Sequence, residues 1–201
     1  MANKQKDKGA RFERAALRHV LTNFSDLVDV DPDLVGRNRA GKKLDPGDLH
    51  LFRDCAVQVK AYGQGVAGAI TALRVAAEGG RDQAAHGGLP RHLGLVPVIG
   101  AIGTSVNWLA AVTTWPVDVR PDEYLTTGSP ALAVARVRND KCGVPRDRRL
   151  AKIVRVGKED IWVSTVDAWM AAYASTRPQV VTGEDGVRRY TLDEIAALLG
   201  A

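Results

Sequence analysis

Fourteen residues decide the fold of this chain, Gly47-Asp48-Leu49-His50-Leu51-Phe52-Arg53-Asp54-Cys55-Ala56-Val57-Gln58-Val59-Lys60. Two short apolar runs, 48–52 and 55–61, lie on either side of a turn and predict two strands paired as a hairpin. Side chains alternate between the two faces of a strand, so Gln58 and Lys60 share one face, about 6.6 Å apart. The short turn brings Asp48 beside them. The hairpin therefore places a carboxylate, an amide and an ammonium group at one end of a small sheet.

Helix and strand patterns lie on both sides of this hairpin. Apolar residues recur at helical spacing over 8–24, and a second helix is predicted over 65–79, where a pair of glycines ends it. Apolar runs at 94–103 and 107–114 predict another hairpin. We therefore expect an α/β fold in which helices flank a central mixed sheet. Up to residue 114 we expect its strands to be connected as hairpins rather than parallel crossovers.

The pattern is less regular after residue 115, where Pro, Arg and Asp are frequent. We expect a core over 1–115 and a basic C-terminal extension over 116–201 that packs on the core or continues it. The elements expected in the extension are a strand at 131–137, a hairpin of 153–156 and 161–163, a helix capped by Ser164 or Thr165, and a helix over 192–199 behind a capping box.

Composition places the chain among ordinary globular proteins. Of its 201 residues, 45% are hydrophobic and 25% are charged, which excludes collagen-like and wholly disordered classes. Two cysteines, Cys55 and Cys142, are too few for a disulfide framework or a zinc site. The N-terminal stretch is polar and lysine-rich, and no run approaches the roughly 18 apolar residues of a membrane span. We therefore expect a cytoplasmic protein with no membrane partner.

Basic residues gather in three clusters, although the formal net charge is only +5 and the pI about 9.4. Clustered charge indicates a polyanion partner better than net charge does. The alternative is that these are solvated faces balanced by acidic residues elsewhere. The residues expected to contact a phosphate backbone are Lys8 and Arg11 in the first cluster, Arg37, Arg39, Lys42 and Lys43 in the second, and Arg146, Arg148 and Arg149 in the third.

The groups at the end of the first hairpin suit metal-assisted hydrolysis of a phosphodiester. Mg²⁺ prefers oxygen ligands and is usually bound by one or two carboxylates together with water and phosphate. The metal lowers the pKa of a bound water and neutralises charge on the phosphate. A lysine beside it orients the attacking water and stabilises the negative charge of the transition state. Asp48 and Lys60 are candidates for these two roles.

This spacing, together with the helix before it, resembles the PD-(D/E)XK nuclease superfamily. The residues that carry the resemblance are Gly47-Asp48, Gln58-Val59-Lys60 and the helical stretch Lys8-Gly9-Ala10-Arg11-Phe12-Glu13. The pattern is most similar to the archaeal-type and phage Holliday junction resolvases, and it covers about residues 8–114. The resemblance implies a restriction-endonuclease-like core with its elements in the order α-β-β-β-α-β, followed by a C-terminal extension.

The resemblance also implies a role for each site residue. The implied metal ligands are Glu13, Asp48, Gln58 and the carbonyl of Val59, and the implied catalytic residues are Lys60, Asp48, Glu13 and Gln58. The chain departs from the family pattern twice. Gly47 separates the proline from Asp48, which leaves Asp45 as an alternative ligand. Gln58 stands where the family usually has glutamate, which removes one negative charge and lowers the expected affinity for metal.

The implied function is that of a Mg²⁺-dependent, structure-selective endodeoxyribonuclease, with Mn²⁺ able to substitute. It would resolve branched DNA during recombination and repair in a prokaryote or in the host of a phage. Cutting two symmetric strands implies a homodimer. Two alternatives stay open. One is a nuclease-fold DNA-binding protein with weak or no activity, and the other is a restriction-type or repair nuclease that cuts duplex DNA.

One competing motif is Gly63-Gln64-Gly65-Val66-Ala67-Gly68, which matches the dinucleotide-binding pattern G-x-G-x-x-G. It follows a predicted strand and opens a predicted helix, as that motif requires. The next strand, however, offers no acidic residue for a ribose hydroxyl. We favour a flexible turn from strand to helix, and we expect no nucleotide cofactor.

Overall fold

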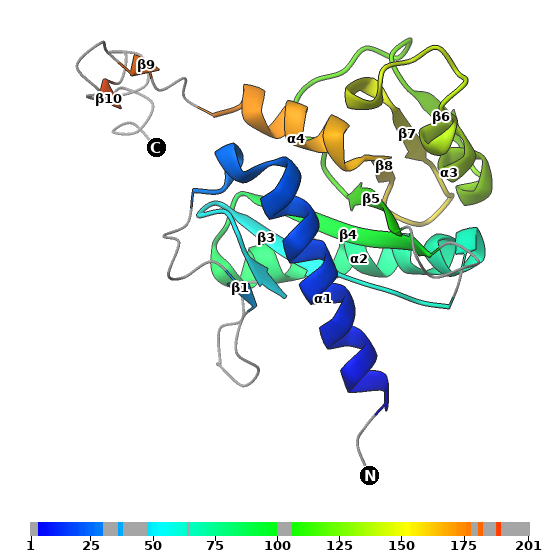
Figure 1. Ribbon diagram of the computed structural model, residues 1–201. Helices are drawn as coiled ribbons and strands as arrows, with labels where there is room; N and C mark the ends of the chain where they lie inside the picture. Colours follow the sequence, from blue (N-terminus) through cyan, green and yellow to red (C-terminus); the bar gives the residue numbers. More distant parts are fainter. Residues whose placement is uncertain are drawn as a thin grey trace.

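The computed structural model describes residues 4–29, 36–37, 48–63, 65–99, 106–177, 181–182 and 188–189. Its main feature is a mixed eight-stranded sheet with helices on both faces (Figure 1). The α/β class expected from the sequence is therefore confirmed. No helix in the described part of the chain is long and apolar enough to cross a membrane.

The N-terminal half supplies the elements around the first hairpin. Their bounds are α1 (Lys4–Asn23), β1 (Gly36–Arg37), β2 (Leu49–His50), β3 (Cys55–Val59), α2 (Gly65–Gly87), β4 (Arg91–Ile99) and β5 (Val106–Val112). Helix α1 buries Phe12, Ala16 and Val20, which are members of the apolar stripe that predicted it. Strand β3 is buried along its whole length, as befits a central strand.

The C-terminal half adds three strands to the same sheet. Its elements are β6 (Leu125–Thr127), α3 (Pro130–Arg138), β7 (Leu150–Ile153), β8 (Ile161–Thr165) and α4 (Val166–Ser175), followed by the paired β9 (Val181–Thr182) and β10 (Arg188–Arg189). The strand order is β1-β2-β3-β4-β5-β8-β7-β6. Strands β3 and β4 pair in parallel, as do β6 and β7, and the other pairs of this sheet are antiparallel. The part of the chain after residue 115 therefore continues the sheet.

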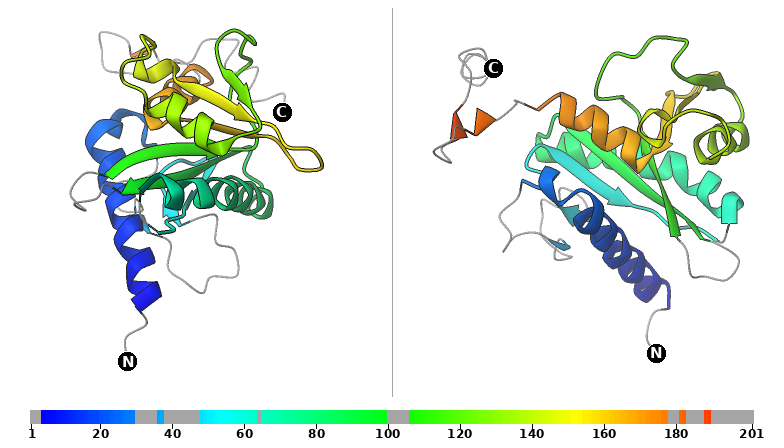
Figure 2. Two further views of the ribbon diagram at one scale, coloured as in Figure 1. Left: turned by 90° about the vertical axis from the view of Figure 1, so that its right-hand side faces the viewer. Right: turned by 45° about the horizontal axis from the view of Figure 1, so that its top comes forward.

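Helices cover the two faces of the sheet in separate layers. Buried apolar side chains form two clusters, one joining Phe12 of α1 and Trp169 of α4 to the sheet, the other joining Leu73 of α2 and Val134 of α3 to it. Figure 2 shows α1 and α2 on opposite sides of the sheet. Because neighbouring residues of a strand face opposite layers, the sheet can present polar groups on the α2 side while its other face packs on α1.

The connection from β3 to β4 differs from the expected hairpins. The two strands are parallel, and α2 is the crossover between them. The glycine pair expected to end the helix at residue 79 lies inside α2, which runs on to Gly87. Both glycines face the sheet, where a Cβ on Gly79 would contact Gln58 at 3.4 Å and one on Gly80 would contact His92 at 3.5 Å. Packing against the sheet therefore carries the helix past the glycine pair.

The strand expected at 131–137 is wrong, because these residues lie in helix α3. Ser129 caps the helix by accepting a hydrogen bond from the Leu132 N–H at 3.4 Å, and Pro130 occupies its first turn. Ala133, Val134 and Val137 are buried at helical spacing. The alternation of small and apolar residues resembled a strand, but the cap and the proline determine a helix.

The expected hairpin near residues 153–163 and the helix after it are confirmed. Strands β7 and β8 pair antiparallel, and Thr165 caps α4 by accepting from the Ala168 N–H at 3.1 Å. The helix expected over 192–199 lies outside the described residues.

Helix α4 holds the turn between β2 and β3 in place. The Tyr173 hydroxyl donates to Asp54 in this turn at 2.7 Å, and Arg91 forms an ion pair with the same carboxylate. Burial, together with the bond to Asp54, raises the pKa of the Tyr173 phenol well above its usual range. Arg177 follows the helix and donates to the Leu27 carbonyl at 2.7 Å. The turn of this hairpin is thus held by a residue of α4 that lies 119 positions further along the chain.

The glycine motif after β3 has a structural explanation in the turn that leads into α2. Gly63 and Gly65 adopt positive φ angles of 58° and 63°, which residues with a side chain rarely adopt. Gly68 touches the chain just before the helix, since a Cβ there would lie 1.8 Å from the Tyr62 carbonyl oxygen. The motif therefore permits a tight turn and close packing of α2.

Replacing Gly68 with alanine should destabilise the protein by about 3 kcal/mol or more, because the new methyl group would collide with backbone. Gly79→Ala is the matched change in the same helix. Its Cβ would make an ordinary contact at 3.4 Å, and alanine favours a helix by about 1 kcal/mol over glycine. Urea unfolding of both variants checks this, and equal stabilities would contradict the packing role of Gly68.

His92 is a buried histidine that is held neutral in the folded protein. Its Nε2 accepts a hydrogen bond from the Thr113 backbone N–H at 2.9 Å. Burial, with a smaller effect of Arg81, lowers the pKa of His92 to about 4. The histidine therefore serves the packing of α2 on β4, and its neutral form is needed to accept the bond.

The imidazole of His92 is protonated near pH 6.5 in the unfolded chain, whereas burial lowers its pKa to about 4 in the folded protein. Stability should therefore fall as the pH drops through this window, by about 3 kcal/mol from this group alone. His92→Gln keeps an acceptor but cannot titrate, so its stability should fall less. Urea unfolding at pH 7 and pH 4.5 measures the difference, and parallel losses in both proteins would refute the assignment.

Candidate functional site

The carboxylate of Asp48 is fixed at the end of the β2–β3 hairpin by its neighbours in the sheet. The Asp48 backbone N–H donates to the Val57 carbonyl at 2.8 Å, which sets the start of β2 against β3. Its side-chain oxygen Oδ2 accepts a hydrogen bond from the Val59 backbone N–H at 2.7 Å and another from the Gln58 amide. The structure therefore brings Asp48, Gln58 and Val59 together, and it gives the carboxylate one orientation.

Gln58 is buried on the face of the sheet that α2 covers. The residue is only 2% exposed, and its Oε1 lies 3.4 Å from the position that a Cβ on Gly79 would take. An amide carries both a donor and an acceptor, so a half-turn of this group presents Oε1 where Nε2 now faces Asp48. Gln58 is therefore able to act either as a hydrogen-bond donor to the carboxylate or as a neutral oxygen ligand.

Lys60 and Glu13 are close enough to act electrostatically on Asp48. Burial is the main cause that raises the pKa of Asp48 above its ordinary value, and the carboxylate of Glu13 raises it further. The Val59 N–H, the ammonium of Lys60 and the Gln58 amide oppose this rise. Both charged residues are half-buried. Glu13 of α1 and Lys60 at the end of β3 thus place charges of opposite sign near the carboxylate of Asp48.

These donors fit a hard divalent cation. Glu13 and Asp48 offer carboxylate oxygens and Gln58 offers an amide oxygen, the ligand types that Mg²⁺ prefers. A cation would also relieve the repulsion between the two carboxylates. The described residues contain no group of three or more His, Cys, Asp or Glu side chains that could hold a metal, so water and substrate would complete the coordination. Asp45, the alternative to Asp48, lies outside the described residues.

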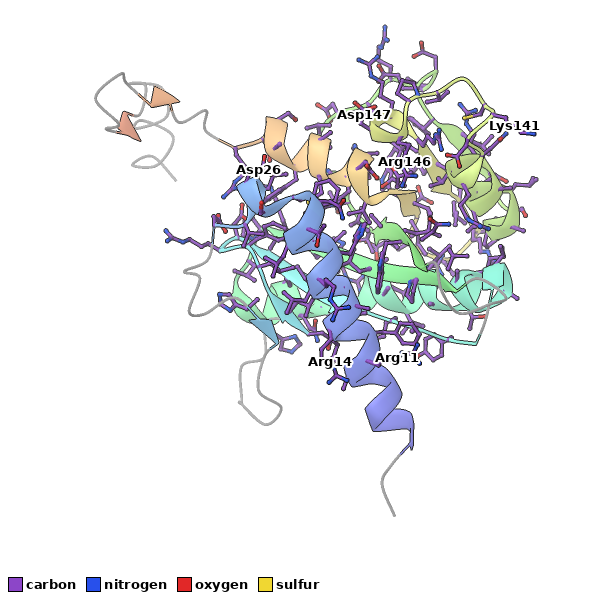
Figure 3. The ribbon with its side chains drawn as sticks, viewed as in Figure 1. Arg11, Arg14, Asp26, Lys141, Arg146 and Asp147 are labelled. Atoms are coloured by element: carbon purple, nitrogen blue, oxygen red, sulfur yellow. The ribbon has the colours of Figure 1, made fainter. Side chains whose placement is uncertain are left out.

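Helix α1 carries an exposed basic stripe beside this site. Arg11, Arg14 and Arg18 are all exposed, and their spacing places them on one face of the helix. Figure 3 shows Arg11 and Arg14 projecting from the N-terminal half of α1. Of the other residues expected to contact phosphate, Lys8 and Arg37 have described backbone in α1 and β1, while Arg39, Lys42 and Lys43 lie outside the described residues.

The third basic cluster divides into exposed and buried members. Arg148 is exposed, and Arg146 is exposed beside the start of α4, where it lies 3.4 Å from the Asp167 carboxylate (Figure 3). Arg149 corrects the expectation of a surface contact, because it is only 6% exposed. Its guanidinium donates to the Val144 carbonyl at 2.9 Å and pairs with Asp140. Arg149 therefore lies below the outer surface, at the wall of a small cavity.

Sequence reasoning missed the part that α2 has in the site. The sequence predicts a helix end at Gly79, whereas this residue lies within α2 and faces the Gln58 amide. Two adjacent glycines in an otherwise helical stretch were the available signal, since such residues inside a helix often mark a close approach. The contact limits the space around the Gln58 amide.

No protein-family model matches this chain, and no curated protein or solved structure shows significant similarity to it. The chemistry of the site therefore has to be argued from its own residues.

Proposed function

We propose that this chain is a metal-dependent endodeoxyribonuclease with a restriction-endonuclease-like core, and that its substrate is branched DNA of the Holliday junction type. The observation that carries the proposal is the convergence of Glu13, Gln58 and Lys60 on the carboxylate of Asp48, beside the end of β3. The element order α1-β1-β2-β3-α2-β4 supports it, because the resemblance implies this order.

Each residue of the site has a part in hydrolysis. Bound Mg²⁺ would supply an acidified water and neutralise charge on the scissile phosphate. Asp48 and Glu13 would hold the cation, and the hydrogen bond from the Val59 N–H keeps Asp48 Oδ2 in place. Gln58 would add a neutral oxygen after its amide turns. Lys60 would orient the water toward phosphorus and stabilise the negative charge that develops.

The exposed stripe on α1 supplies a surface for the phosphate backbone next to Glu13. Arg11, Arg14 and Arg18 extend along the helix over about 10 Å at 1.5 Å per residue. Contacts of this kind are independent of sequence and weaken steeply with salt. They favour nucleic acid over a small phosphate ester as the substrate.

The experiment that tests the proposal compares three labelled substrates, a four-way junction, a nicked duplex and a plain duplex, each with Mg²⁺ or with EDTA. Paired symmetric cuts in the junction alone, lost in EDTA, are the expected result. Cutting of the plain duplex at an equal rate would show that the substrate is duplex DNA, as for restriction and repair nucleases. Binding without cutting in either Mg²⁺ or Mn²⁺ would overturn the proposal that the chain is an enzyme.

A second candidate function is a DNA-binding protein on a nuclease-like fold with little or no activity. The observation that favours it is Gln58, whose amide donates to Asp48 where a second acid would otherwise be expected. A neutral ligand weakens the attraction for a divalent cation. The substrate comparison separates the two candidates, because only the enzyme produces cuts.

Gln58→Glu should increase affinity for Mg²⁺ by about tenfold, because it adds a negative charge to the ligand set. Without metal the new carboxylate would face Asp48, so we expect a lower Tm in EDTA that recovers in Mg²⁺. Gln58→Met is the matched variant of similar size with no oxygen, and its affinity should fall below that of the wild type. The Mg²⁺ dependence of cleavage measures all three, and an unchanged requirement in Gln58→Glu would remove Gln58 from the site.

A further inference from the structure

A small polar cavity of about 90 Å³ lies between β5, β8 and the segment that joins α3 to β7. Three arginines line it, Arg138, Arg146 and Arg149, together with the side chain of Asn107. Arg149 lines the cavity with a side chain that is only 7% exposed. A buried guanidinium needs anionic or carbonyl partners around it.

Arg149 pairs with one exposed carboxylate, that of Asp140, and Arg138 and Arg146 line the same cavity. The hydrogen bond and charge of Arg149 lower the pKa of Asp140 below its ordinary value, and Arg146 and Arg138 lower it further. Arg146 also faces Asp167 at 3.4 Å. The region thus holds three arginine side chains and two carboxylates, those of Asp140 and Asp167. The Asp140 side chain is 74% exposed.

Thr165, a residue that lines this cavity, lies close to the row of the sheet that ends at Lys60. Lys60 follows β3 and donates its backbone N–H to Leu95 at 3.1 Å. Thr165, which lines the cavity, pairs with Leu109, and Leu109 pairs with Val96, the next residue of β4. The two sites therefore lie in nearly the same row of the sheet. Three strand spacings separate β3 from β8, which amounts to about 14 Å.

We propose that the cavity of Arg138, Arg146 and Arg149 binds a phosphate group, and that in the protein's function this group is a backbone phosphate of the DNA cut beside Lys60. A separation of about 14 Å is short enough for both phosphates to belong to the same stretch of backbone, within a few nucleotides of the scissile phosphate. Paired guanidinium groups match the oxygens of a phosphate. This assignment of the DNA path rests on the proposed function.

Asp140 occupies the position of the anion when no phosphate is bound. Its carboxylate forms the ion pair with Arg149 from an exposed position, so an incoming phosphate can displace it toward solvent. The displacement keeps the buried guanidinium paired throughout, which avoids the cost of an isolated buried charge. Asp140 therefore competes with the ligand, and its removal should strengthen binding.

The test compares Arg138→Gln with Arg155→Gln in the full chain. Both changes remove one positive charge from the C-terminal half, but Arg155 is exposed between β7 and β8 and does not line this cavity. Binding of inorganic phosphate is measured by calorimetry, and binding of a labelled four-way junction is measured in EDTA at several salt concentrations. We expect Arg138→Gln to weaken both ligands about fivefold and to reduce the salt slope for DNA by about 1, with less than a twofold change for Arg155→Gln.

A third variant, Asp140→Asn, keeps a hydrogen-bond acceptor for Arg149 and should bind phosphate more tightly than the wild type. If Arg138→Gln weakens phosphate but leaves DNA binding unchanged, the cavity takes a free phosphate and the proposed DNA path is wrong. If neither ligand responds more to Arg138→Gln than to Arg155→Gln, the phosphate cavity itself is refuted. Mg²⁺-dependent cutting by the wild type would still uphold the nuclease in both cases, and only its absence would refute that function.

Discussion

Lys60→Ala is expected to slow Mg²⁺-dependent cleavage of the four-way junction by about 10²–10⁴-fold. The ammonium group lies near Asp48 at the end of β3, where it would orient the water and stabilise the charge that develops on the phosphate. Junction binding should change little, because the exposed arginines of α1 remain. Single-turnover cleavage at saturating enzyme measures the chemical step directly.

Lys158→Ala is the matched control for the loss of one positive charge. Lys158 is exposed in the connection between β7 and β8, away from the carboxylates of the site. It should cut at nearly the wild-type rate. If Lys60→Ala also keeps the normal rate, the proposed mechanism is wrong even when the protein is a nuclease.

Asp48→Asn should abolish cleavage, with a loss of about three orders of magnitude, because several kcal/mol of charge stabilisation by the metal would disappear. It should also raise the Tm of the metal-free protein at pH 7. The folded protein raises the pKa of Asp48, so keeping this carboxylate ionised costs stability above that pKa. Asparagine retains an oxygen for the Val59 N–H without the charge.

The stability gain of Asp48→Asn should fade on acidification, since the wild-type carboxyl then becomes neutral as well. The gain in Tm should also vanish in Mg²⁺, because only the wild type is then stabilised by a bound cation. Asp118→Asn removes an exposed carboxylate and serves as the control, with no change in Tm or rate expected. A lower Tm for Asp48→Asn at pH 7 would show that the carboxylate stabilises the fold rather than a bound cation.

Local patterns predicted most of the elements around the site. The β2–β3 hairpin follows from alternation and turn residues that are adjacent in sequence, and α1 follows from its apolar stripe. Such signals need no knowledge of distant contacts. They also predicted which strand end would carry Asp48, Gln58 and Lys60, because a short turn fixes the neighbours across a hairpin.

Long-range packing explains the expectations that were wrong. The parallel pairing of β3 with β4 depends on how α2 crosses the sheet, and the glycine pair inside α2 resembles a helix end in the sequence alone. The small apolar residues of α3 suit a strand as well as a helix, so the cap at Ser129 decides between them. Arg149 is buried because Asp140 and the Val144 carbonyl meet it in space.

The central claim is that Glu13, Asp48 and Gln58 hold a divalent cation beside Lys60. Electron paramagnetic resonance of free Mn²⁺ during titration of the metal-free protein counts the cations bound per chain. The account predicts a site in the wild type that Asp48→Asn loses and Asp118→Asn retains. Equal binding by the wild type and Asp48→Asn, or none by the wild type at millimolar Mn²⁺, would contradict it.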